Sequence, residues 1–344
     1  MVKKFCIIMT LLIITTISLA ACQTAAVTEA DCPKVEVLCV GLVTGLDGVD
    51  DRSFDQTAWE GVLKAQTDKV ADWVLSIETV DAKDYDQNIA IFANAGYDVI
   101  VTVGDLLGEA TTNAAKSFPD ILFIGVDQDQ GEVLPNLVGL VFHEDQSGFL
   151  AGALAAQMTR TNTIAAVLGP DTEPEVVALK EGYEAGAKYI NPNITIISTY
   201  YPGGSEVTFT DPRWGASTAA QVIQNGADVV FGAGGKTGNG ALIETASHPG
   251  LYCIGVDTDQ WETDLAAHPC LISSAMKLIT LGVFDLVKLA KDGTFPAGNY
   301  FGTSGLAPFH DFDSVITQAV KDKISQISVG LNGGSITTGY YPGG

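Results

Sequence analysis

Short apolar runs alternate with longer amphipathic stretches along most of this chain. The runs lie at 35–43, 72–80, 97–104, 120–127 and 137–142, and again at 163–169, 194–201, 228–234, 251–257 and 270–276. Continuous Val, Ile and Leu, without strict alternation with polar residues, is typical of strands buried on both faces of a sheet. The pattern therefore predicts two α/β units, each with a parallel sheet and helices packed on both of its faces.

The two halves of the chain are related by an internal repeat with an offset of 130 residues. Four matches share this offset: Asp98-Val99-Ile100 with Asp228-Val229-Val230, Gly104 with Gly234, GVDQDQ at 125–130 with GVDTDQ at 255–260, and Gly152 with Gly282. The period is far too long for a solenoid unit. It predicts a duplicated lobe, in which GFLAGALAA and LITLGVFDL are equivalent helices.

The repeat also predicts where the chain passes between the lobes. We expect lobe 1 to span 35–143 plus 277–303, and lobe 2 to span 144–275 plus 304–344. Ligands bind at the carboxyl edge of parallel sheets, so two facing edges form a cleft. Asp127 and Asp257 end equivalent strands and are expected to line it. The alternative is that each aspartate only stabilises a turn.

The N-terminus has the form of an export signal. Lys3 and Lys4 precede the stretch 5–21, which contains no acidic residue and ends in Leu-Ala-Ala before Cys22. We interpret 1–21 as a lipoprotein signal peptide, Cys22 as the lipidated residue and 22–34 as a linker. An uncleaved membrane anchor and an ordinary signal peptide are the alternatives. Lipidation would hold the protein on the extracytoplasmic face of the cell membrane, through the lipid alone.

Charge and cysteine content narrow the class further. The formal net charge of −23 opposes binding to nucleic acid. Export permits disulfides, and we favour Cys32 with Cys39 and Cys253 with Cys270, because the latter two open strand-like runs. Unpaired buried thiols are the alternative. The spacing of cysteines and histidines resembles no metal site.

The motifs of common enzymes and cofactor sites do not fit. VFGAGGKTG resembles a phosphate-binding loop, but the motif needs glycine where Val230 stands. The sequence contains no G-x-S-x-G nucleophile elbow. We therefore expect no catalysis and no cofactor. The competing hypothesis is an exported nucleoside hydrolase or glycosidase that uses paired carboxylates among Asp50, Asp51, Asp127 and Asp257.

Five segments in order give the chain a family resemblance. They are DDRSFDQTAWEG at 50–61, SFPDILFIGVDQ with PNLVGLVFHEDQSGFLAGALAA, EGYEAGAKYINPNI, GADVVFGAGGKTGNG, and IGVDTDQ followed by ISSAMK. The chain resembles the basic membrane protein family, whose members are lipoprotein binding components of nucleoside ABC importers. The resemblance implies a type I periplasmic-binding-protein fold of two doubly wound lobes joined by a hinge. It also implies a purine nucleoside in the cleft and a permease and ATPase complex as partner. A sugar or an autoinducer is the alternative ligand.

The resemblance also implies a set of ligand-binding residues. The first loop would supply Asp51, Ser53, Phe54, Asp55 and Gln56 to the base. Phe209 would stack on the other face of the base; the alternative is that Phe209 belongs to the hydrophobic core. Gly234, Asp257 and Lys277 would bind the ribose; the alternative is that Asp257 and Lys277 only form a salt bridge. The family usually has SFNQ where this chain has SFDQ at 53–56. An ionised Asp55 would accept a hydrogen bond from N1–H of guanine or hypoxanthine. Adenine N1 is itself an acceptor and would be repelled, so the substitution favours guanosine and inosine.

Overall fold

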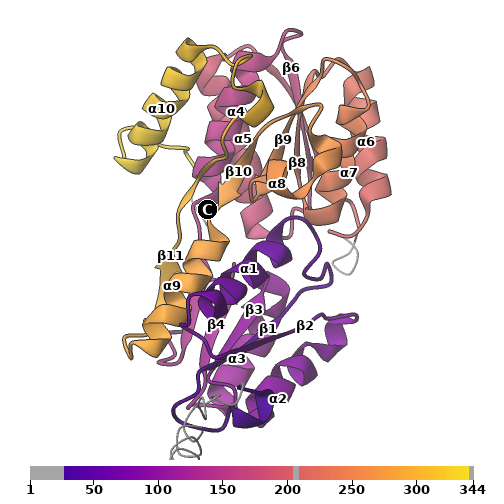
Figure 1. The fold of residues 1–344 in the computed structure, drawn as a ribbon. Coiled ribbons are helices and arrows are strands. Elements are labelled where there is room, and N and C mark those ends of the chain that lie inside the picture. Colours follow the sequence, from indigo (N-terminus) through magenta and orange to yellow (C-terminus); the bar gives the residue numbers. More distant parts are fainter. Residues whose placement is uncertain (1–26, 204–208, 341–344) are drawn as a thin grey trace, which may run out of the picture.

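The computed structural model describes residues 27–203 and 209–340, in which the chain forms two α/β lobes stacked end to end (Figure 1). Each lobe contains a six-stranded sheet, and the strand orders are β11-β5-β4-β3-β1-β2 and β12-β10-β9-β8-β6-β7. The first five strands of each lobe therefore have the same 2-1-3-4-5 order, typical of doubly wound folds. The expected architecture of two doubly wound lobes is confirmed.

The first sheet is built from the apolar runs of the first half of the chain. Its inner strand β3 is buried at every position, as expected for a β-branched run covered on both faces. The sheet consists of β1 (Cys39–Val43), β2 (Trp73–Ile77), β3 (Val99–Val103), β4 (Leu122–Val126), β5 (Leu137–Val141) and β11 (Gly298–Phe301), all parallel.

The second sheet repeats this arrangement with one difference at its edge. It consists of β6 (Thr163–Leu168), β7 (Thr195–Tyr200), β8 (Val229–Ala233), β9 (Tyr252–Asp257), β10 (Leu271–Lys277) and β12 (Ser304–Leu306). β12 pairs antiparallel with β10, so this sheet is mixed rather than purely parallel. β11 and β12 were not predicted from the sequence, because GNYF and SGL are too short and too polar to stand out as buried strands.

Four α-helices cover the first sheet. They are α1 (Phe54–Thr67), α2 (Tyr85–Ala95), α3 (Gly108–Ser117) and, from the second half of the chain, α9 (Ile279–Lys291). Val283 and Leu286 of α9 are fully buried in the core beside Val101 and Ile124. The short 3-10 helices η1 (Glu29–Asp31), η2 (Ala82–Asp84) and η3 (Asp105–Leu107) belong to the same lobe. The apolar face of α9 thus places it with lobe 1, although its sequence neighbours lie in lobe 2.

The second sheet is covered by helices from its own segment and from the C-terminus. They are α4 (Glu144–Met158), α5 (Pro174–Ile190), α6 (Pro212–Gln224), α7 (Gly235–Ala246), α8 (Gln260–Thr263) and α10 (Gln318–Asn332), with η4 (Leu265–Ala267) and η5 (His310–Phe312). α4 and α5 pack at very short range, because a Cβ added to Gly152 would lie 1.8 Å from the Tyr183 carbonyl oxygen. The glycine therefore permits backbone contact between the two helices.

The chain passes between the lobes three times. The crossings lie between β5 and α4, between β10 and α9, and between β11 and β12. The second and third crossing segments are hydrogen-bonded to each other: the Leu278 N–H donates to the Thr303 carbonyl at 2.9 Å. From these memberships we propose that the lobes lie close to the predicted bounds of 35–143 plus 277–303 and 144–275 plus 304–344, except that Lys277 ends β10 and belongs to lobe 2, and that Cys32, bonded to Cys39, belongs to lobe 1.

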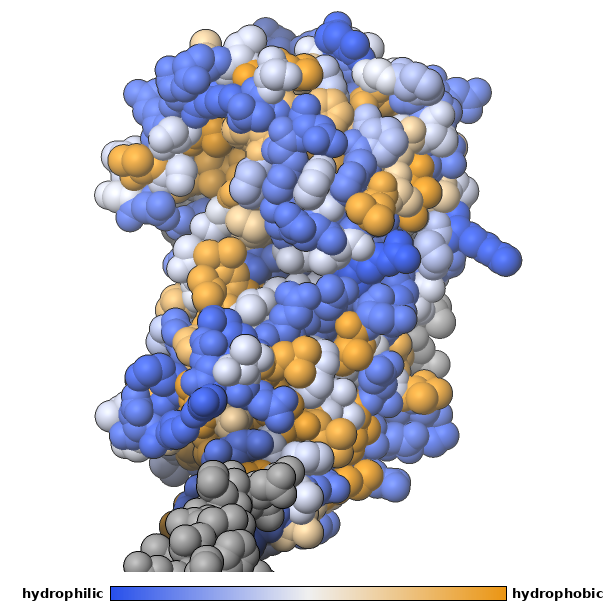
Figure 2. All heavy atoms as spheres, in the orientation of Figure 1, coloured by the Kyte–Doolittle hydropathy of each residue, from blue (hydrophilic) through white to orange (hydrophobic). Residues whose placement is uncertain are grey.

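Each lobe contains one disulfide, and these are the pairs that the sequence favours. Cys32 bonds to Cys39 and Cys253 to Cys270. The signal peptide 1–21 and Cys22 lie outside the described residues. Within residues 27–203 and 209–340, no helix combines the length and apolar character needed to cross a bilayer. The face shown in Figure 2 is mainly hydrophilic, with hydrophobic side chains in small separate patches.

Candidate functional site

A pocket lies between the two lobes at the carboxyl ends of the strands. It encloses about 880 Å³, a volume that includes the open solvent at its mouth. Seven of the predicted ligand-binding residues line it: Phe54, Asp55, Asp127, Phe209, Gly234, Asp257 and Lys277. Both lobes contribute, so the cleft expected from the repeat contains these groups.

The two repeat-related aspartates share an unusual backbone conformation. Asp127 follows β4 and Asp257 ends β9, and their φ angles of 55° and 66° lie in the left-handed region, which aspartate tolerates better than most residues. This conformation turns the chain sharply at the end of the strand. Both carboxylates are buried and line the pocket. The turn-forming and pocket-lining interpretations of these residues therefore both apply.

Among the described residues that line the pocket, one is positively charged: Lys277. Its Nζ forms an ion pair with Asp127 and lies 3.6 Å from Asp257 Oδ1 and 3.9 Å from Glu144 Oε1. Burial alone would lower the pKa of Lys277, but the three carboxylates raise it above its ordinary value. The ammonium is therefore protonated, and it also lies 4.7 Å from the centre of the Phe54 ring.

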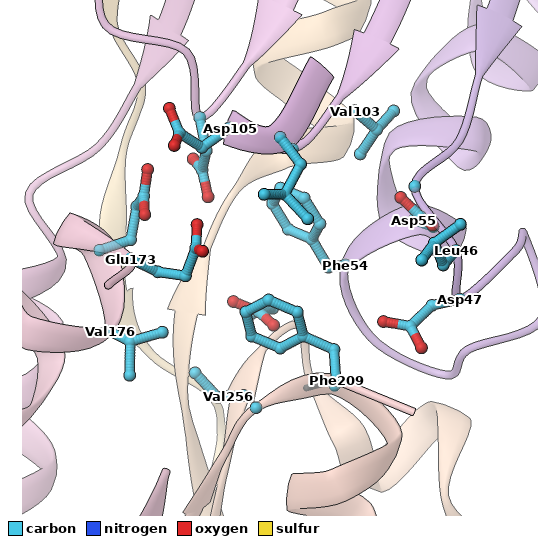
Figure 3. A pocket seen from close by; sticks show the side chains of 18 of the residues that line it. Leu46, Asp47, Phe54, Asp55, Val103, Asp105, Glu173, Val176, Phe209 and Val256 are labelled. Atoms are coloured by element: carbon cyan, nitrogen blue, oxygen red, sulfur yellow. The ribbon is translucent and has the colours of Figure 1, made fainter. Parts of the chain in front are cut away.

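Two phenylalanines form the apolar part of the pocket. Figure 3 shows the rings of Phe54, from lobe 1, and Phe209, from lobe 2, in its middle. Asp47 and Asp55 lie at one end, and Asp105 and Glu173 at the other. A flat ligand between the rings would thus have carboxyl groups at both ends.

The carboxyl groups at the Asp55 end interact with one another. Burial raises the pKa of Asp55 well above its ordinary value, and Asp51 and Asp47 add to the shift. Burial raises the pKa of Asp47 to about 7, and Asp51 contributes again. This burial favours the protonated form of Asp55 more than in an exposed aspartate. The expectation of an ionised Asp55 did not include this effect, because the sequence does not show that three carboxyl groups are buried together.

Three predicted residues of the first loop do not line the pocket. The Asp51 carboxylate accepts hydrogen bonds from the backbone N–H groups of Ser53, Asp55 and Gln56 at 2.9 to 3.0 Å. It therefore caps the N-terminus of α1. Ser53 is buried, and its hydroxyl donates to Asp257 Oδ2 at 2.9 Å. The Gln56 side chain donates to Glu60 on α1. Asp51 and Ser53 thus support the site, and Gln56 is not among the residues that line the pocket.

Several pocket-lining residues were not predicted from the sequence. The polar ones are Asp47, Tyr85, Asp105, Glu173, Glu175 and Thr210. For Asp105 a signal was available, because it follows Gly104, the residue that the repeat matches with Gly234. Glu173 and Glu175 begin a helix that faces the cleft only through the packing of α5 on α4, and no sequence motif marks them.

The loop between β1 and α1, residues 44–53, crosses the cleft and contacts lobe 2 in several places; we call it the interlobe loop. Its Arg52 has a φ of 62°, and its guanidinium pairs with the fully buried Asp264 at 3.2 Å. The Arg52 carbonyl accepts from Thr263 Oγ1 at 2.8 Å. Asn239 Nδ2 donates to the Asp51 carbonyl at 3.0 Å. These bonds join the lobes directly, beside the pocket rather than through it.

A second group of ionisable residues lies outside the pocket lining, on lobe 2. Asp259, Glu262 and His310 each offer one atom within 4.8 Å of the others, and His310 Nε2 lies 2.7 Å from Asp259 Oδ2. The Asp259 carboxylate also accepts from the Trp261 N–H at the start of α8. These bonds tie η5 to α8.

Comparison with known proteins agrees with the fold and the cleft. Residues 40–306 match the family model Bmp, described as ABC transporter substrate-binding protein PnrA-like. The chain is 30% identical to the ABC transporter nucleoside-binding protein BmpA of Lactococcus lactis over 87% of this chain and 88% of the relative. It is 31% identical to basic membrane protein A of Borreliella burgdorferi over 93% and 92%.

Solved structures show the same architecture. A solute-binding protein of an ABC transporter from Aeropyrum pernix superimposes with a TM-score of 0.77 at 22% identity, covering 87% of this chain and 92% of that one. A periplasmic ribose ABC transporter protein from Conexibacter woesei gives a TM-score of 0.59 at 16% identity, over 84% and 97%. At these identities the likeness shows the fold alone. The family match extends over most of the sequence, from β1 to β12, and includes the pocket. The chain therefore belongs to the Bmp family of PnrA-like ABC transporter substrate-binding proteins and is a binding protein, not an enzyme.

Proposed function

We propose that this protein captures a purine nucleoside between its lobes and delivers it to the permease and ATPase complex of an ABC importer. The observation that carries the proposal is the pair of phenylalanine rings, one from each lobe, in a pocket with polar groups at both ends (Figure 3). A purine offers two flat faces for stacking and a polar edge. The name of the Lactococcus lactis relative, a nucleoside-binding protein, agrees with this proposal.

The base would lie between Phe54 and Phe209 with its polar edge toward Asp47 and Asp55. Burial raises the pKa of Asp55 well above its ordinary value, which favours its protonated form. Asp47, with a pKa of about 7, is partly ionised at neutral pH and accepts hydrogen bonds. Guanine and hypoxanthine donate from N1, so an accepting carboxylate favours guanosine and inosine over adenosine. The preference for guanosine and inosine therefore depends on Asp47 rather than on Asp55 alone.

The ribose would bind at the centre of the strand edges. Asp257 accepts hydrogen bonds and the Lys277 ammonium donates them, which suits neighbouring hydroxyls. Gly234 lets the backbone of lobe 2 approach the ligand closely. Asp127 Oδ1 is a buried acceptor without a hydrogen-bond donor among the described residues. A ribose hydroxyl at this position would satisfy it.

Ligand binding would stabilise the closed arrangement of the lobes. Three chain crossings form a hinge about which rigid lobes can rotate. A ligand favours the closed state only by contacting groups on both sides of the cleft. Phe54 with Asp55 from lobe 1 and Phe209 with Asp257 from lobe 2 meet this condition. The permease would then recognise the closed form.

The protein would be held at the extracytoplasmic face of the membrane by lipid on Cys22. The motif that supports this lies outside the described residues, so its test is biochemical. In detergent phase partitioning the wild-type protein should enter the detergent phase, and Cys22→Ala should not. Wild-type protein in the aqueous phase would contradict the lipid anchor.

Calorimetric titration with guanosine tests the binding proposal. Asp257→Ala and Phe54→Ala should each lower affinity about tenfold to a hundredfold, because each removes a buried contact with the ligand. Asp86→Ala, on the exposed face of α2, is the control. Small-angle scattering should show compaction on saturation. Equal guanosine affinity in all four proteins would contradict the assignment of the site.

The same samples decide between the alternative functions. Titration with ribose and galactose tests a sugar ligand, which would bind in place of guanosine. Chromatography of the guanosine recovered after incubation tests hydrolysis. Recovery of intact guanosine is the expected result, and release of guanine would contradict the proposal.

A further inference from the structure

One end of the pocket contains more carboxyl groups than the proposed nucleoside contacts use. Asp105 of η3, on lobe 1, lines it together with Glu173 and Glu175 at the start of α5, on lobe 2. Figure 3 shows Asp105 and Glu173 at the end of the pocket opposite Asp47. The phenylalanine rings lie between these two ends. A nucleoside whose base edge points toward Asp47 would therefore extend its ribose toward these three carboxyl groups.

The start of α5 would attract anions if these residues were neutral. Free backbone N–H groups and the helix dipole make a helix N-terminus a good phosphate site. Glu173 occupies the N-cap position of α5, yet its side chain makes no capping hydrogen bond. It is only 6% exposed and lines the pocket. Helix capping thus does not account for its burial, whereas a role toward the ligand does.

The described cations leave these three carboxyl groups without an ion-pair partner. Lys277, the nearest positive charge in the pocket, pairs with Asp127, Asp257 and Glu144 instead. Burial raises the pKa of Glu175 to about 8, and Asp127 and Asp105 add to the shift. Burial also raises the pKa of Glu173, with Asp105 as a further cause. Asp105 therefore disfavours negative charge on Glu173 and Glu175 across the cleft, and it would disfavour an additional negative charge there in the same way.

We propose that Asp105, Glu173 and Glu175 form an anion-excluding wall, which admits an uncharged or cationic group at the ribose end of the ligand and rejects a phosphate. The wall would make the protein select nucleosides against nucleotides. This inference rests on the proposed function, because it takes the ribose end from the proposed orientation of the base. Charges interact more strongly in a partly buried pocket than in water, so a nearby phosphate is strongly disfavoured and an ammonium is favoured.

Three ligands that differ only in the group at the ribose 5′ position, and thereby in charge, test the wall. They are guanosine, guanosine 5′-monophosphate and 5′-amino-5′-deoxyguanosine, titrated calorimetrically at pH 8.5, above the pKa of about 8 of Glu175. For the wild type we expect the amine to bind more tightly than guanosine, and the monophosphate about a hundredfold more weakly. In the triple variant Asp105→Asn, Glu173→Gln, Glu175→Gln the monophosphate penalty should shrink about tenfold or more.

A control variant separates a local effect from a change in total charge. Glu36→Gln, Asp120→Asn and Glu132→Gln remove the same three charges from exposed residues outside the pocket lining. This variant should keep the wild-type ratios between the three ligands. A similar loss of discrimination in both triple variants would show that the effect is long-range, and the wall would be rejected.

The outcomes distinguish the wall from the proposed function. If the wild type binds guanosine and the triple variant keeps the same ratio between guanosine and its monophosphate, the wall is wrong and the proposed function stands. If the wild type binds none of the three ligands, the proposed function is wrong. Should the triple variant not fold, Asp105→Asn and Glu175→Gln are measured singly. Each should shrink the monophosphate penalty about threefold, and an unchanged penalty in both would reject the wall.

Discussion

Asp127 and Asp257 occupy the same position in the two lobes but have different partners. Each follows an equivalent strand in left-handed conformation. Asp127, on lobe 1, receives Lys277 from a strand of lobe 2, whereas Asp257, on lobe 2, receives the Ser53 hydroxyl from lobe 1. Each carboxylate therefore binds a group from the opposite lobe. The duplicated backbone corner is preserved and Lys277 lies near both carboxylates, but the group that each receives from the opposite lobe differs.

The loops after these aspartates differ in the same way. Gln130 bonds within its own lobe and to β11, through the Gln128 carbonyl and the Asn299 side chain. Its repeat partner Gln260 is fully buried; it accepts from the Val256 N–H at 2.9 Å and donates to Asn239 at 2.7 Å. Asn239 in turn donates to the interlobe loop of lobe 1. The interlobe loop of lobe 1 therefore packs on lobe 2, which provides its hydrogen-bond partners.

The largest expected difference between the lobes concerns the matched glycines Gly152 and Gly282. A Cβ on Gly152 would lie 1.8 Å from the Tyr183 carbonyl, whereas a Cβ on Gly282 would lie 2.8 Å from the side-chain methyl groups of Leu140. Backbone cannot move aside without separating α4 from α5, but a leucine side chain can rotate. Gly152→Ala should therefore cost about 3 kcal/mol of unfolding free energy or more, and Gly282→Ala about 1 kcal/mol.

Urea denaturation followed by circular dichroism measures both variants. The wild type and Gly293→Ala, at an exposed turn where a Cβ meets no atom within 4 Å, are the references. Gly293 has a φ of 68°, so its own substitution includes a backbone cost. Equal losses at Gly152 and Gly282 would contradict the difference in helix packing between the lobes.

A smaller effect is expected from the ion pair of the interlobe loop. The Arg52 guanidinium contacts the buried Asp264 across the cleft and does not line the pocket. Arg52→Ala should open the lobes and lower guanosine affinity about fivefold to thirtyfold, because ligand binding must then supply the lost closure energy. Calorimetry and small-angle scattering give the two readouts.

A matched ion pair within one lobe is the control for this prediction. Arg160 lies 3.7 Å from the buried Asp228, and both belong to lobe 2. Arg160→Ala should therefore leave guanosine affinity at the wild-type value. If both arginine variants change affinity to the same extent, the effect of Arg52 is not due to closure.

The smallest expected effect is a difference in pH dependence between the lobes. Burial raises the pKa of Glu175, on lobe 2, to about 8 and that of Asp47, on lobe 1, to about 7. The folded state then holds more protons than the unfolded state between the ordinary carboxyl pKa and these values. Its stability must fall as pH rises through that window. Between pH 7 and pH 8 the Glu175 contribution is about 1 kcal/mol or less.

Glu175→Gln should therefore flatten the stability profile up to pH 8, and Asp47→Asn should flatten it only up to pH 7. Thermal denaturation at half-unit pH intervals measures both profiles. Glu132→Gln, at an exposed position of lobe 1, should keep the wild-type slope. A Glu175→Gln profile as steep as the wild type would show that this carboxyl group titrates at its ordinary pKa.

The sequence by itself determined the architecture of this protein. Buried parallel strands produce continuous apolar runs, and a duplicated lobe keeps residues at one offset, so Asp127, Asp257 and the paired helices could be located from the chain alone. The family motifs correctly indicated an ABC transporter substrate-binding protein. These features are encoded locally or by repetition, which a single sequence displays directly.

Only the tertiary structure decided which polar groups share the pocket. Asp51 and Gln56 belong to the family motif, yet neither lines the pocket: Asp51 caps α1, and the Gln56 side chain bonds along that helix. Glu173 and Glu175 carry no motif, but the packing of α5 turns them into the cleft. The raised pKa of Asp55 likewise depends on burial beside other carboxyl groups. Such properties arise from contacts between distant segments, and the pattern of neighbouring residues along the chain does not contain them.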